Sequence, residues 1–444
     1  MSSTVQDLNR TGKGEGQPVG VALLGFGTVG AEVFRLLTEH ANDYTQRIGG
    51  PVEVRGIAVS DLKKDRPGVP AELITDDARA LIARDDVDLV VEVIGGIDYP
   101  RELVLDALNA GKSVVTANKA LVAAHADGLA EAADAAGVDL YYEAAVAAAI
   151  PVVGMLRRSL AGDHIQRISG IVNGTTNFIL DAMESTGATY DDALAEATRL
   201  GYAEADPTAD VEGHDAASKA AIMASLGFYT RVNFEDVYCE GISNVTSEDI
   251  AAANQAGYTI KLLAICERLT REDGTEAVNA RVHPTLVPKE HPLATVSESY
   301  NAIFVEAEAA GSLMFYGNGA GGYPTASAVV GDIVGASRNI VYGGRAPGDN
   351  TYANLPIADA GEALTCYHID MQVDERTGVL AAISSEFASQ GVSLRTVRQE
   401  GSEEGARLIV VTHTARESAL RKIVETLTQL DVVKEVNSVL RLDS

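Results

Sequence analysis

From Val19 to about residue 150, short apolar runs alternate with amphipathic stretches. The runs VGVALLG, VEVRGIAV, DLVVEVIGG, KSVVTAN and VDLYYEAAV predict buried strands. Between them, AEVFRLLTEH, RELVLDALNAG and GLAEAADAAGV place apolar residues at helical spacing. Strands that alternate with helices are typical of a parallel sheet covered on both faces. Residues 19–150 are therefore predicted to form a Rossmann-like α/β domain.

The next part of the chain, residues 151–355, mixes long helices with a separate set of strands. DDALAEATRLG and DAASKAAIMASLGF have the helical period, whereas RISGIVNG, NAIFVEAEAA and GSLMFYG predict strands. This combination predicts an α+β domain. The stretch YGGRAPGDNTYANLP has no apolar period and is rich in Gly, Pro and Asn, so it predicts a boundary loop.

Residues 362–444 repeat a compact order of elements. YHIDMQV, SLRTVRQEG, ARLIVVTH and VKEVNSVLRL predict strands, while GVLAAISSEFASQG and ESALRKIVETLTQL predict helices. The resulting βαββαβ order is the ferredoxin-like arrangement. At the other end, residues 1–18 are polar and glycine-containing, and they predict a disordered tail rather than a signal peptide.

Composition narrows the class of function. The 444 residues carry a formal net charge of -28, which repels phosphate backbones and anionic lipids and so argues against nucleic-acid and membrane-surface functions. The three cysteines are far apart and form no CxxC pair, which indicates a reducing, cytoplasmic environment. No apolar run is long enough to span a bilayer.

A glycine turn follows the first predicted strand and opens the first predicted helix. Gly25, Gly27 and Gly30 match G-x-G-x-x-G. In this motif the first glycine allows a tight turn, the second lets the backbone approach a pyrophosphate, and the third lets the helix pack against the strand. We therefore predict that a dinucleotide binds along the turn, whose residues are Gly25, Phe26, Gly27, Thr28, Val29 and Gly30.

The end of the second predicted strand bears on which dinucleotide is bound. NAD sites usually place an acidic residue there, but here Ser60 stands at that position, with Asp61 next and the cations Lys63, Lys64 and Arg66 behind it. A small polar residue followed by cations would accommodate a 2′-phosphate, which favours NADP. The alternative is an ordinary solvated loop, which leaves NAD possible.

The segment GYAEADPTADVEGHDAASKAAI concentrates acidic residues and then enters a helix that carries Lys219. Asp215 and Lys219 are four residues apart and share a face of that helix. The simplest interpretation is an ordinary surface ion pair. However, the rest of the helix is Ala, Ile, Met and Leu, which favours burial. Carboxylates suit a substrate with an α-ammonium group, and a buried lysine suits a carbonyl that needs a proton during reduction.

Taken together, seven motifs resemble homoserine dehydrogenase, in that family's order and over nearly all of residues 19–355. They are GFGTVG, VVEVIGG, SVVTANKAL, EAAVAAAIP, GIVNGTTNFIL, GYAEADPTADVEGHDAASK and FYGNGAGGYPTASAVVGD. The resemblance implies reversible hydride transfer between L-homoserine and L-aspartate 4-semialdehyde, on the route to threonine, methionine and isoleucine.

The resemblance also implies that residues 151–355 form the substrate-binding, catalytic and dimerisation domain, and it implies roles for individual residues. Lys219 would be the proton donor and acceptor, and Lys119 would lie between cofactor and substrate. Gly201, Glu204 and Asp215 would hold the amino-acid end of the substrate. Thr116 and Gly321 would join the glycine turn in binding the cofactor.

The family further carries a monovalent cation, typically sodium, near EAxVxxxIP. Carried over, its ligands would be Glu143, Val146, Ala148 and Ile150, mainly through backbone oxygens. The family usually has glycine where this chain has Ala148. A carbonyl ligand survives that change, but a φ angle available only to glycine would not.

The C-terminal βαββαβ unit resembles an ACT domain. Such domains commonly bind an amino acid near the turn before their first helix, here around Gly378, between paired copies. The resemblance implies threonine as effector and a homo-oligomer, either a dimer or a tetramer. A dimerisation module without a ligand is the alternative.

Two rival functions remain open. Another amino-acid dehydrogenase would act on a longer or shorter substrate. A sensor would bind dinucleotide and amino acid without catalysis, although it would not need a lysine as proton donor.

Overall fold

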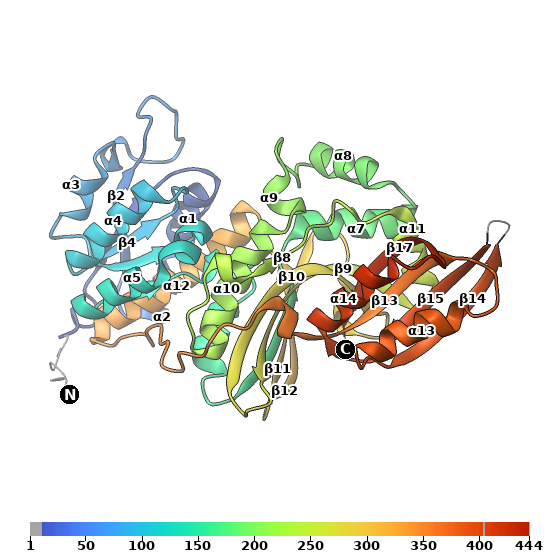
Figure 1. The fold of residues 1–444 in the computed structure, drawn as a ribbon. Coiled ribbons are helices and arrows are strands. Elements are labelled where there is room, and N and C mark those ends of the chain that lie inside the picture. Colours follow the sequence, from blue (N-terminus) through green and yellow to red (C-terminus); the bar gives the residue numbers. More distant parts are fainter. Residues whose placement is uncertain (1–10, 403–404, 444) are drawn as a thin grey trace. The chain divides into compact units, whose positions relative to one another are not determined.

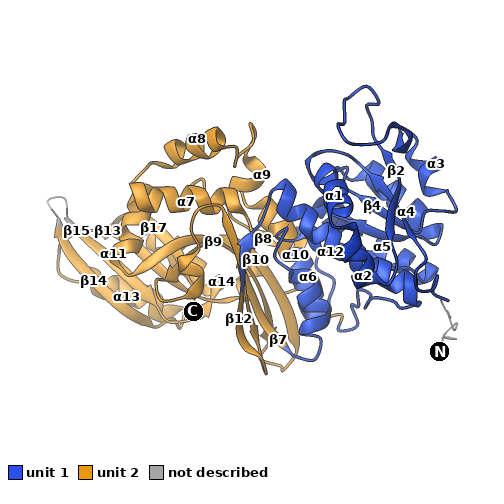
Figure 2. Ribbon diagram, turned by 180° about the vertical axis from the view of Figure 1, so that it is seen from behind, with its two compact units in different colours: residues 1–164, 221–234, 315–353 blue, residues 165–220, 235–314, 354–444 orange. Residues whose placement is uncertain are grey.

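The computed structural model describes residues 11–402 and 405–443, which form two compact units (Figure 2). Unit 1 contains the described residues up to 164 together with residues 221–234 and 315–353. Unit 2 contains residues 165–220, 235–314 and 354–443. Each unit therefore combines segments that lie far apart in the sequence.

A six-stranded sheet with parallel strand pairs forms the centre of unit 1, in the order β3-β2-β1-β4-β5-β6. Figure 1 labels two of these strands, β2 and β4. The order reverses between β1 and β4, as in doubly wound nucleotide-binding folds. The strands are β1 (Val19–Leu24), β2 (Val52–Ala58), β3 (Ile74–Thr75), β4 (Leu89–Glu92), β5 (Ser113–Thr116) and β6 (Leu140–Tyr141). This confirms the Rossmann-like α/β prediction.

Two groups of helices accompany this sheet. Helices α1, α2 and α12 contact one another, and α3, α4 and α5 form the second group. Their bounds are α1 (Thr28–Glu39), α2 (Ala41–Ile48), α3 (Ala78–Ile82), α4 (Asp98–Asn109), α5 (Lys119–Ala136) and α12 (Gly322–Tyr342). Alternate residues of β1 pack with α1 and α12 in one hydrophobic cluster. This packing explains why α12 belongs to unit 1, although the sequence pattern placed it with residues 151–355.

The predicted domain limits of 19–150, 151–355 and 362–444 remain a prediction. The two compact units do not coincide with them, because each unit combines segments from more than one predicted domain. Of the predicted disordered tail, residues 1–10 lie outside the described residues. Residues 13–16 are held by hydrogen bonds: Lys13 and Gly14 donate backbone N–H groups to the end of α12, and Gly16 donates to Gly49. The Lys13 ammonium pairs with Asp88 at 2.7 Å. This part of the segment is therefore bound to unit 1.

Unit 2 contains most of a mixed sheet with the order β12-β11-β7-β9-β10-β17-β13-β15-β14. Its strands are β7 (Ile165–Ile171), β8 (Tyr238–Cys239), β9 (Tyr258–Thr270), β10 (Glu276–Pro288), β11 (Tyr300–Ala307), β12 (Gly311–Asn318), β13 (Leu364–Val373), β14 (Leu394–Ser402), β15 (Gly405–Thr412), β16 (Ala415–Arg416) and β17 (Val433–Leu442). The β9–β10 hairpin, with thirteen residues in each strand, was not predicted.

Further helices accompany the part of this sheet that precedes the C-terminal residues, and α7 and α11 contact its strand β9. They are α7 (Gly174–Thr186), α8 (Tyr190–Leu200), α9 (Thr208–Val211), α10 (His214–Phe228) and α11 (Ser247–Gln255). Helix α7 starts directly after β7 because Asn173 caps it, accepting the Thr176 N–H at 2.9 Å. The end of β7 and the start of α7 therefore have fixed positions.

The C-terminal residues form the predicted βαββαβ unit, with α13 (Val379–Ser389) and α14 (Glu417–Leu427). Its core contains Ile369, Ile383, Phe387, Leu420 and Ile423. Its last strand, β17, also pairs in parallel with β10, at Thr285–Arg441 and Leu286–Leu442. The C-terminal sheet and the preceding sheet are therefore continuous, which the sequence pattern did not predict.

One predicted strand is shorter than expected. In VDLYYEAAV only Leu140 and Tyr141 form β6, and Glu143–Ala145 form a 3-10 turn instead. Short irregular elements follow, namely α6 (Val152–Gly154) and a π-helical turn at Met155–Ser159. In the part of the chain that the structure describes, no helix has the length and apolar character needed to cross a membrane.

Candidate active site

The glycine turn between β1 and α1 has the geometry that a phosphate-binding turn requires. Gly25 has φ +101°, which L side chains rarely adopt. A Cβ on Gly30 would lie 2.4 Å from the Gly25 carbonyl oxygen, so a side chain there would collide with the turn. A Cβ on Gly27, by contrast, would meet no atom within 4 Å. The backbone at Gly27 is therefore open to a ligand, while Gly25 and Gly30 shape the turn.

An open hollow of about 930 Å³ adjoins this turn. Gly25, Phe26 and Gly27 line it, together with Ser60, Asp61, Lys64 and Arg66 from the loop after β2. The Asp61 carboxylate accepts the Lys63 N–H at 2.8 Å, and its backbone carbonyl accepts from the Arg66 guanidinium at 2.8 Å. This pocket has the position and lining expected of a dinucleotide cleft.

The carboxyl ends of β4 and β5 are tied together by a buried glutamate. Glu92 is fully buried, and its carboxylate accepts from the Thr116 hydroxyl at 2.5 Å and from the Ile94 N–H at 2.8 Å. Thr116 is thus held by Glu92 and lies inside the fold rather than on the wall of the pocket. The sequence analysis did not identify Glu92, although VVEVIGG places this charged residue inside an apolar run.

Lys119 lies at the first position of α5, directly after this network. Asn118 caps the helix by accepting the Leu121 N–H at 3.1 Å, and its amide donates to the Gly96 carbonyl at 2.7 Å. Lys119 itself is exposed. Gly321, which has φ +114°, precedes α12. At the neighbouring Gly322, a Cβ would lie 2.5 Å from Cγ2 of Thr28 in α1, which brings the start of α12 against the glycine turn.

In unit 2, the side chains of Asn173, Asp210, Asp215 and Lys219 form one hydrogen-bonded cluster. The Lys219 Nζ donates to the Asp215 carboxylate at 2.7 Å and to the Val172 carbonyl at 2.5 Å. The Asn173 amide donates to Asp215 at 2.9 Å and to Asp210 at 2.7 Å. Lys219 and Asp215 are each only 7% exposed. The pair is therefore a buried, networked site and not the surface ion pair of the simplest interpretation.

Asn173 is a residue of this cluster that the sequence analysis missed. The motif GIVNGTTNF contains it, but Asn-Gly after a strand is equally typical of an ordinary turn. In the structure the side chain of Asn173 both caps α7 and joins the two carboxylates. Its side-chain oxygen accepts the Thr176 N–H, while its side-chain NH₂ group donates to Asp210 and Asp215.

The other two residues predicted to bind substrate flank the cluster. Gly201, with φ +80°, ends α8, and Glu204 lies exposed in the loop before α9. The carbonyl of Tyr202 between them accepts the Thr175 hydroxyl at 2.8 Å, which fixes the loop to α7. The exposed carboxylate of Glu204 thus lies on the loop between α8 and α9, the helix that carries Asp210.

The predicted cation ligands form a tight turn in unit 1. Ala147 and Ala148 have φ +54° and +45°, so the backbone adopts the left-handed conformation without glycine. The hydrogen bonds of the described residues include none to the carbonyl oxygens of the buried Val146 and Ala148. Two orphaned buried carbonyls are what a cation ligand set offers. The carbonyl of Ile150 accepts the Val152 N–H at 2.8 Å.

The carboxylate of Glu143 is oriented by the start of α6, because it accepts the N–H groups of Val153 and Gly154 at 2.8 and 2.7 Å. Burial raises the pKa of Glu143. Among the described residues no three His, Cys, Asp or Glu side chains form a metal cluster. The donor set therefore fits a cation bound by carbonyl oxygens and one carboxylate better than it fits a transition metal.

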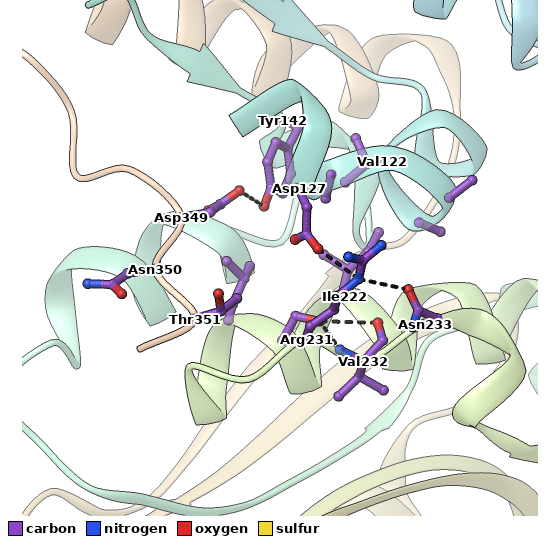
Figure 3. A pocket seen from close by; sticks show the side chains of 15 residues that line it. Val122, Asp127, Tyr142, Ile222, Arg231, Val232, Asn233, Asp349, Asn350 and Thr351 are labelled. Carbon is purple, nitrogen blue, oxygen red and sulfur yellow. Dashed lines mark hydrogen bonds and ion pairs between the residues drawn. The ribbon is translucent and has the colours of Figure 1, made fainter. Parts of the chain in front are cut away.

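A second hollow in unit 1, of about 530 Å³, lies beside α5 (Figure 3). Figure 3 shows Asp127 paired with Arg231, at 2.7 Å, and the hydroxyl of Tyr142 bonded to Asp349, at 2.6 Å. None of the residues predicted to bind cofactor, substrate or cation lines it. In unit 2, Gly378 has φ +93° and caps α13, so the turn predicted to bind an amino acid directly precedes this helix.

Comparison with protein families matches three consecutive parts of the chain. Residues 25–143 match "Homoserine dehydrogenase, NAD binding domain", residues 151–334 match "Homoserine dehydrogenase" and residues 367–432 match "ACT domain". The three matches follow the order of the predicted Rossmann-like, catalytic and ACT segments.

Relatives of known name align along the whole chain. A homoserine dehydrogenase of Corynebacterium glutamicum is 71% identical, with 100% of both chains covered, and one of Bacillus subtilis is 41% identical over 95% of this chain and 98% of its own. Among solved structures, a homoserine dehydrogenase from Thiobacillus denitrificans has a TM-score of 0.90 and 39% identity, covering 97% of this chain and 99% of that one. A hyperthermophilic archaeal homoserine dehydrogenase in complex with NADPH has a TM-score of 0.60 and 29% identity, covering 72% and 98%.

Proposed function

Since the chain belongs to the homoserine dehydrogenase family and so to the NAD(P)-dependent oxidoreductases, we propose that it interconverts L-homoserine and L-aspartate 4-semialdehyde with the residues predicted above. The observation that carries the residue assignment is the buried cluster of Asn173, Asp210, Asp215 and Lys219. A sensor without catalysis would not need a buried ammonium group held by the Asp215 carboxylate and the Val172 carbonyl.

The cluster suggests a division of labour at the substrate. Lys219 gives its proton to the oxygen of the aldehyde as hydride reaches the carbon, and takes it back in the reverse direction. Asp215 and the exposed Glu204 hold the α-ammonium group, with the backbone at Gly201. Lys119 stabilises the developing charge on the substrate oxygen. Val172 and Asp215 together keep the Lys219 ammonium in one place.

NADP is the proposed hydride carrier, and it supplies the hydride-transfer chemistry when bound. The glycine turn, from Gly25 to Gly30, would hold the pyrophosphate, with Thr116, Lys119 and Gly321 nearby. Ser60, Lys64 and Arg66 at the far end of the cleft support a 2′-phosphate, because Asp61 already accepts a hydrogen bond from its own loop. The NADPH complex of the archaeal relative agrees with this preference.

A monovalent cation, proposed to be sodium, would be held by Glu143, Val146, Ala148 and Ile150. It would supply positive charge that neutralises the buried carboxylate of Glu143 and fixes the turn before α6. Within the described residues no hydrogen bond reaches the carbonyls of Val146 and Ala148, which supports this assignment. Removing sodium and adding it back, with thermal unfolding as readout, would test it: stabilisation by sodium but not by an equal ionic strength of tetramethylammonium is expected.

For the C-terminal domain we propose an amino-acid effector, threonine, and a role in feedback control of threonine, methionine and isoleucine synthesis. The match to an ACT domain supports an amino-acid ligand, and the pathway position of the reaction supports threonine. A homo-oligomer, dimer or tetramer, in the cytoplasm would place two ACT domains together.

Oxidation of NADPH with aspartate semialdehyde tests the activity directly. We expect turnover with NADPH, slower turnover with NADH, and inhibition when threonine is added. A panel of homoserine, threonine and glutamate semialdehyde would separate this enzyme from other amino-acid dehydrogenases. Binding of NADPH without turnover on any of them would instead support a sensor.

A further inference from the structure

The last strand of the C-terminal domain carries a buried arginine that contacts the catalytic domain. Arg441 is 8% exposed and forms ion pairs with Glu417 in α14, at 2.9 Å, and with Glu240, at 2.7 Å. Glu417 belongs to the C-terminal domain, whereas Glu240 follows β8. Arg441 therefore joins the two domains within unit 2 through one guanidinium group.

Glu240 lies on a short segment that is fixed along its length. The Tyr238 hydroxyl donates to the Glu240 carboxylate at 3.0 Å, and the Glu240 N–H donates to the Val282 carbonyl in β10 at 2.9 Å. The Cys239 thiol donates to the Glu212 carbonyl at 3.2 Å. The segment 238–243 therefore starts on the β10 edge and leads to the end of α9.

The second half of this segment presses against α9. A Cβ on Gly241 would lie 2.3 Å from the Val211 carbonyl oxygen and 2.5 Å from Cα of Glu212, so glycine permits a very close approach of the two backbones. The Ile242 N–H donates to the Val211 carbonyl at 2.8 Å, and the Ser243 hydroxyl donates to the Glu212 carboxylate. A shift of segment 238–243 must therefore move the end of α9.

Helix α9 carries Asp210, which belongs to the cluster at the substrate site. Asp210 accepts the Asn173 amide at 2.7 Å, Asn173 donates to Asp215 at 2.9 Å, and Asp215 pairs with Lys219 at 2.7 Å. The contacts from Arg441 to Lys219 thus run through Glu240, α9 and Asn173 without a gap in hydrogen bonding or packing.

We propose that Glu240 is a positioning residue for Asp210 and Asp215, the carboxylates of the substrate cluster. Its ion pair with Arg441 couples the C-terminal domain to these two side chains. Breaking the pair releases the 238–243 segment, and the end of α9 relaxes with it. Asp210 then no longer holds Asn173 in the orientation that serves Asp215. This inference rests on the proposed function, because it assigns Asp215 to substrate binding.

Close packing alone does not establish coupling, so the test measures an interaction free energy through kinetics. The variants are Glu240→Gln, Asp210→Asn and the double variant, compared by kcat/KM for homoserine. If the two residues act on one element, the effect of the double variant differs by about threefold or more from the product of the single effects. We also expect Glu240→Gln to raise the KM for homoserine while the KM for NADP stays unchanged.

The matched control is the pair of Arg271 in β9–β10 with Glu362 at the start of the C-terminal domain, joined at 2.7 Å. This pair also connects the two domains, but it does not lead to α9. Glu362→Gln should leave the KM for homoserine unchanged. In the double variant Glu362→Gln with Asp210→Asn, the change in kcat/KM should equal the product of the two single changes. If Glu240→Gln fails to fold, Tyr238→Phe removes the hydroxyl that fixes Glu240 and takes its place in the cycle.

The outcomes separate the two levels of inference. A wild-type enzyme that does not turn over homoserine overturns the proposed function. A wild-type enzyme that is active, together with purely multiplicative effects of Glu240→Gln and Asp210→Asn, overturns the role of Glu240. An equal rise in the KM for homoserine in Glu240→Gln and Glu362→Gln also overturns it, because the effect would then be general loosening of the domain contact.

Discussion

Two glycines of the turn after β1 allow cofactor binding to be separated from packing. In Gly27→Ala the new Cβ meets no atom within 4 Å, and the backbone angles of φ -82° and ψ -157° suit alanine. Alanine is a poorer N-cap than glycine, at a cost of roughly 0.5–1 kcal/mol. Reduced freedom of the unfolded chain offsets this by about 0.4–1 kcal/mol. The free energy of unfolding should therefore change by less than about 0.5 kcal/mol.

Cofactor binding should nevertheless suffer in Gly27→Ala. The open space at Gly27 is where the pyrophosphate approaches the backbone, so the methyl group holds it away from the N–H groups of α1. A loss of about 1.4 kcal/mol corresponds to a tenfold rise in the dissociation constant. We expect a rise of at least about that size for NADPH.

Gly30→Ala should behave in the opposite way. Its Cβ would lie 2.4 Å from the Gly25 carbonyl oxygen and 3.3 Å from Cγ2 of Val93, so the turn and helix must separate. Such overpacking costs about 1–3 kcal/mol. For a domain of this size the melting temperature should fall by about 2–4 °C per kcal/mol.

Differential scanning fluorimetry gives the melting temperatures, and titration of NADPH fluorescence gives the dissociation constants. The reasoning is refuted if Gly27→Ala melts as early as Gly30→Ala, or if Gly27→Ala binds NADPH as tightly as the wild type. The first result would mean that a Cβ at Gly27 does collide with the fold, and the second that Gly27 does not face the cofactor.

Further predictions concern the substrate cluster and two buried groups. Lys219→Ala should abolish most turnover while NADPH still binds, as single-turnover kinetics and fluorescence titration would show; retained turnover contradicts its role. Asn173→Ala should raise the KM for homoserine about tenfold or more, since a buried hydrogen-bonding partner is worth about 1–3 kcal/mol, and an unchanged KM would exclude Asn173 from the site. Burial lowers the pKa of His283 well below 6.5, with nearby Arg441 adding to the effect, so the native protein binds fewer protons than the unfolded chain at acid pH. The free energy of unfolding should then decrease as pH falls below 6.5, by up to about 1.4 kcal/mol per pH unit, and urea titrations should show a shallower decrease in His283→Gln. Burial raises the pKa of the Cys239 thiol to about 11, so iodoacetamide should modify it very slowly at pH 8 and faster at pH 10; rapid labelling at pH 8 would contradict this.

Sequence patterns predict those features whose causes are local. The glycine turn and the βαββαβ unit were predicted because strand and helix periods and turn glycines depend on neighbouring residues. The pair of Asp215 and Lys219 was predicted because the two residues are four positions apart on one helix. The residue roles at the substrate came from the family resemblance and not from spacing.

Features that depend on distant partners could not be predicted in this way. Helix α12 has an amphipathic pattern, but nothing in that pattern says that β1 and α1 are its partners. Asn173 looks like an ordinary turn residue until Asp210 and Asp215, which lie far ahead in the sequence, are brought beside it. The pairing of β10 with β17 likewise has no local signal, because strand pairing depends on the whole topology.

The outer edge of β10 has a consequence for shortened forms of the enzyme. Three separate pieces pair with this edge: β8 at Arg281 and Val282, Ile357 at Val278, and β17 at Thr285 and Leu286. Two of the three come after residue 355. Removing the C-terminal domain, residues 362–444, would take away β17 and so uncover backbone N–H and C=O groups at Thr285 and Leu286 of a long apolar strand, which is a template for aggregation. Point substitutions within the C-terminal domain should accordingly cause less aggregation than truncation.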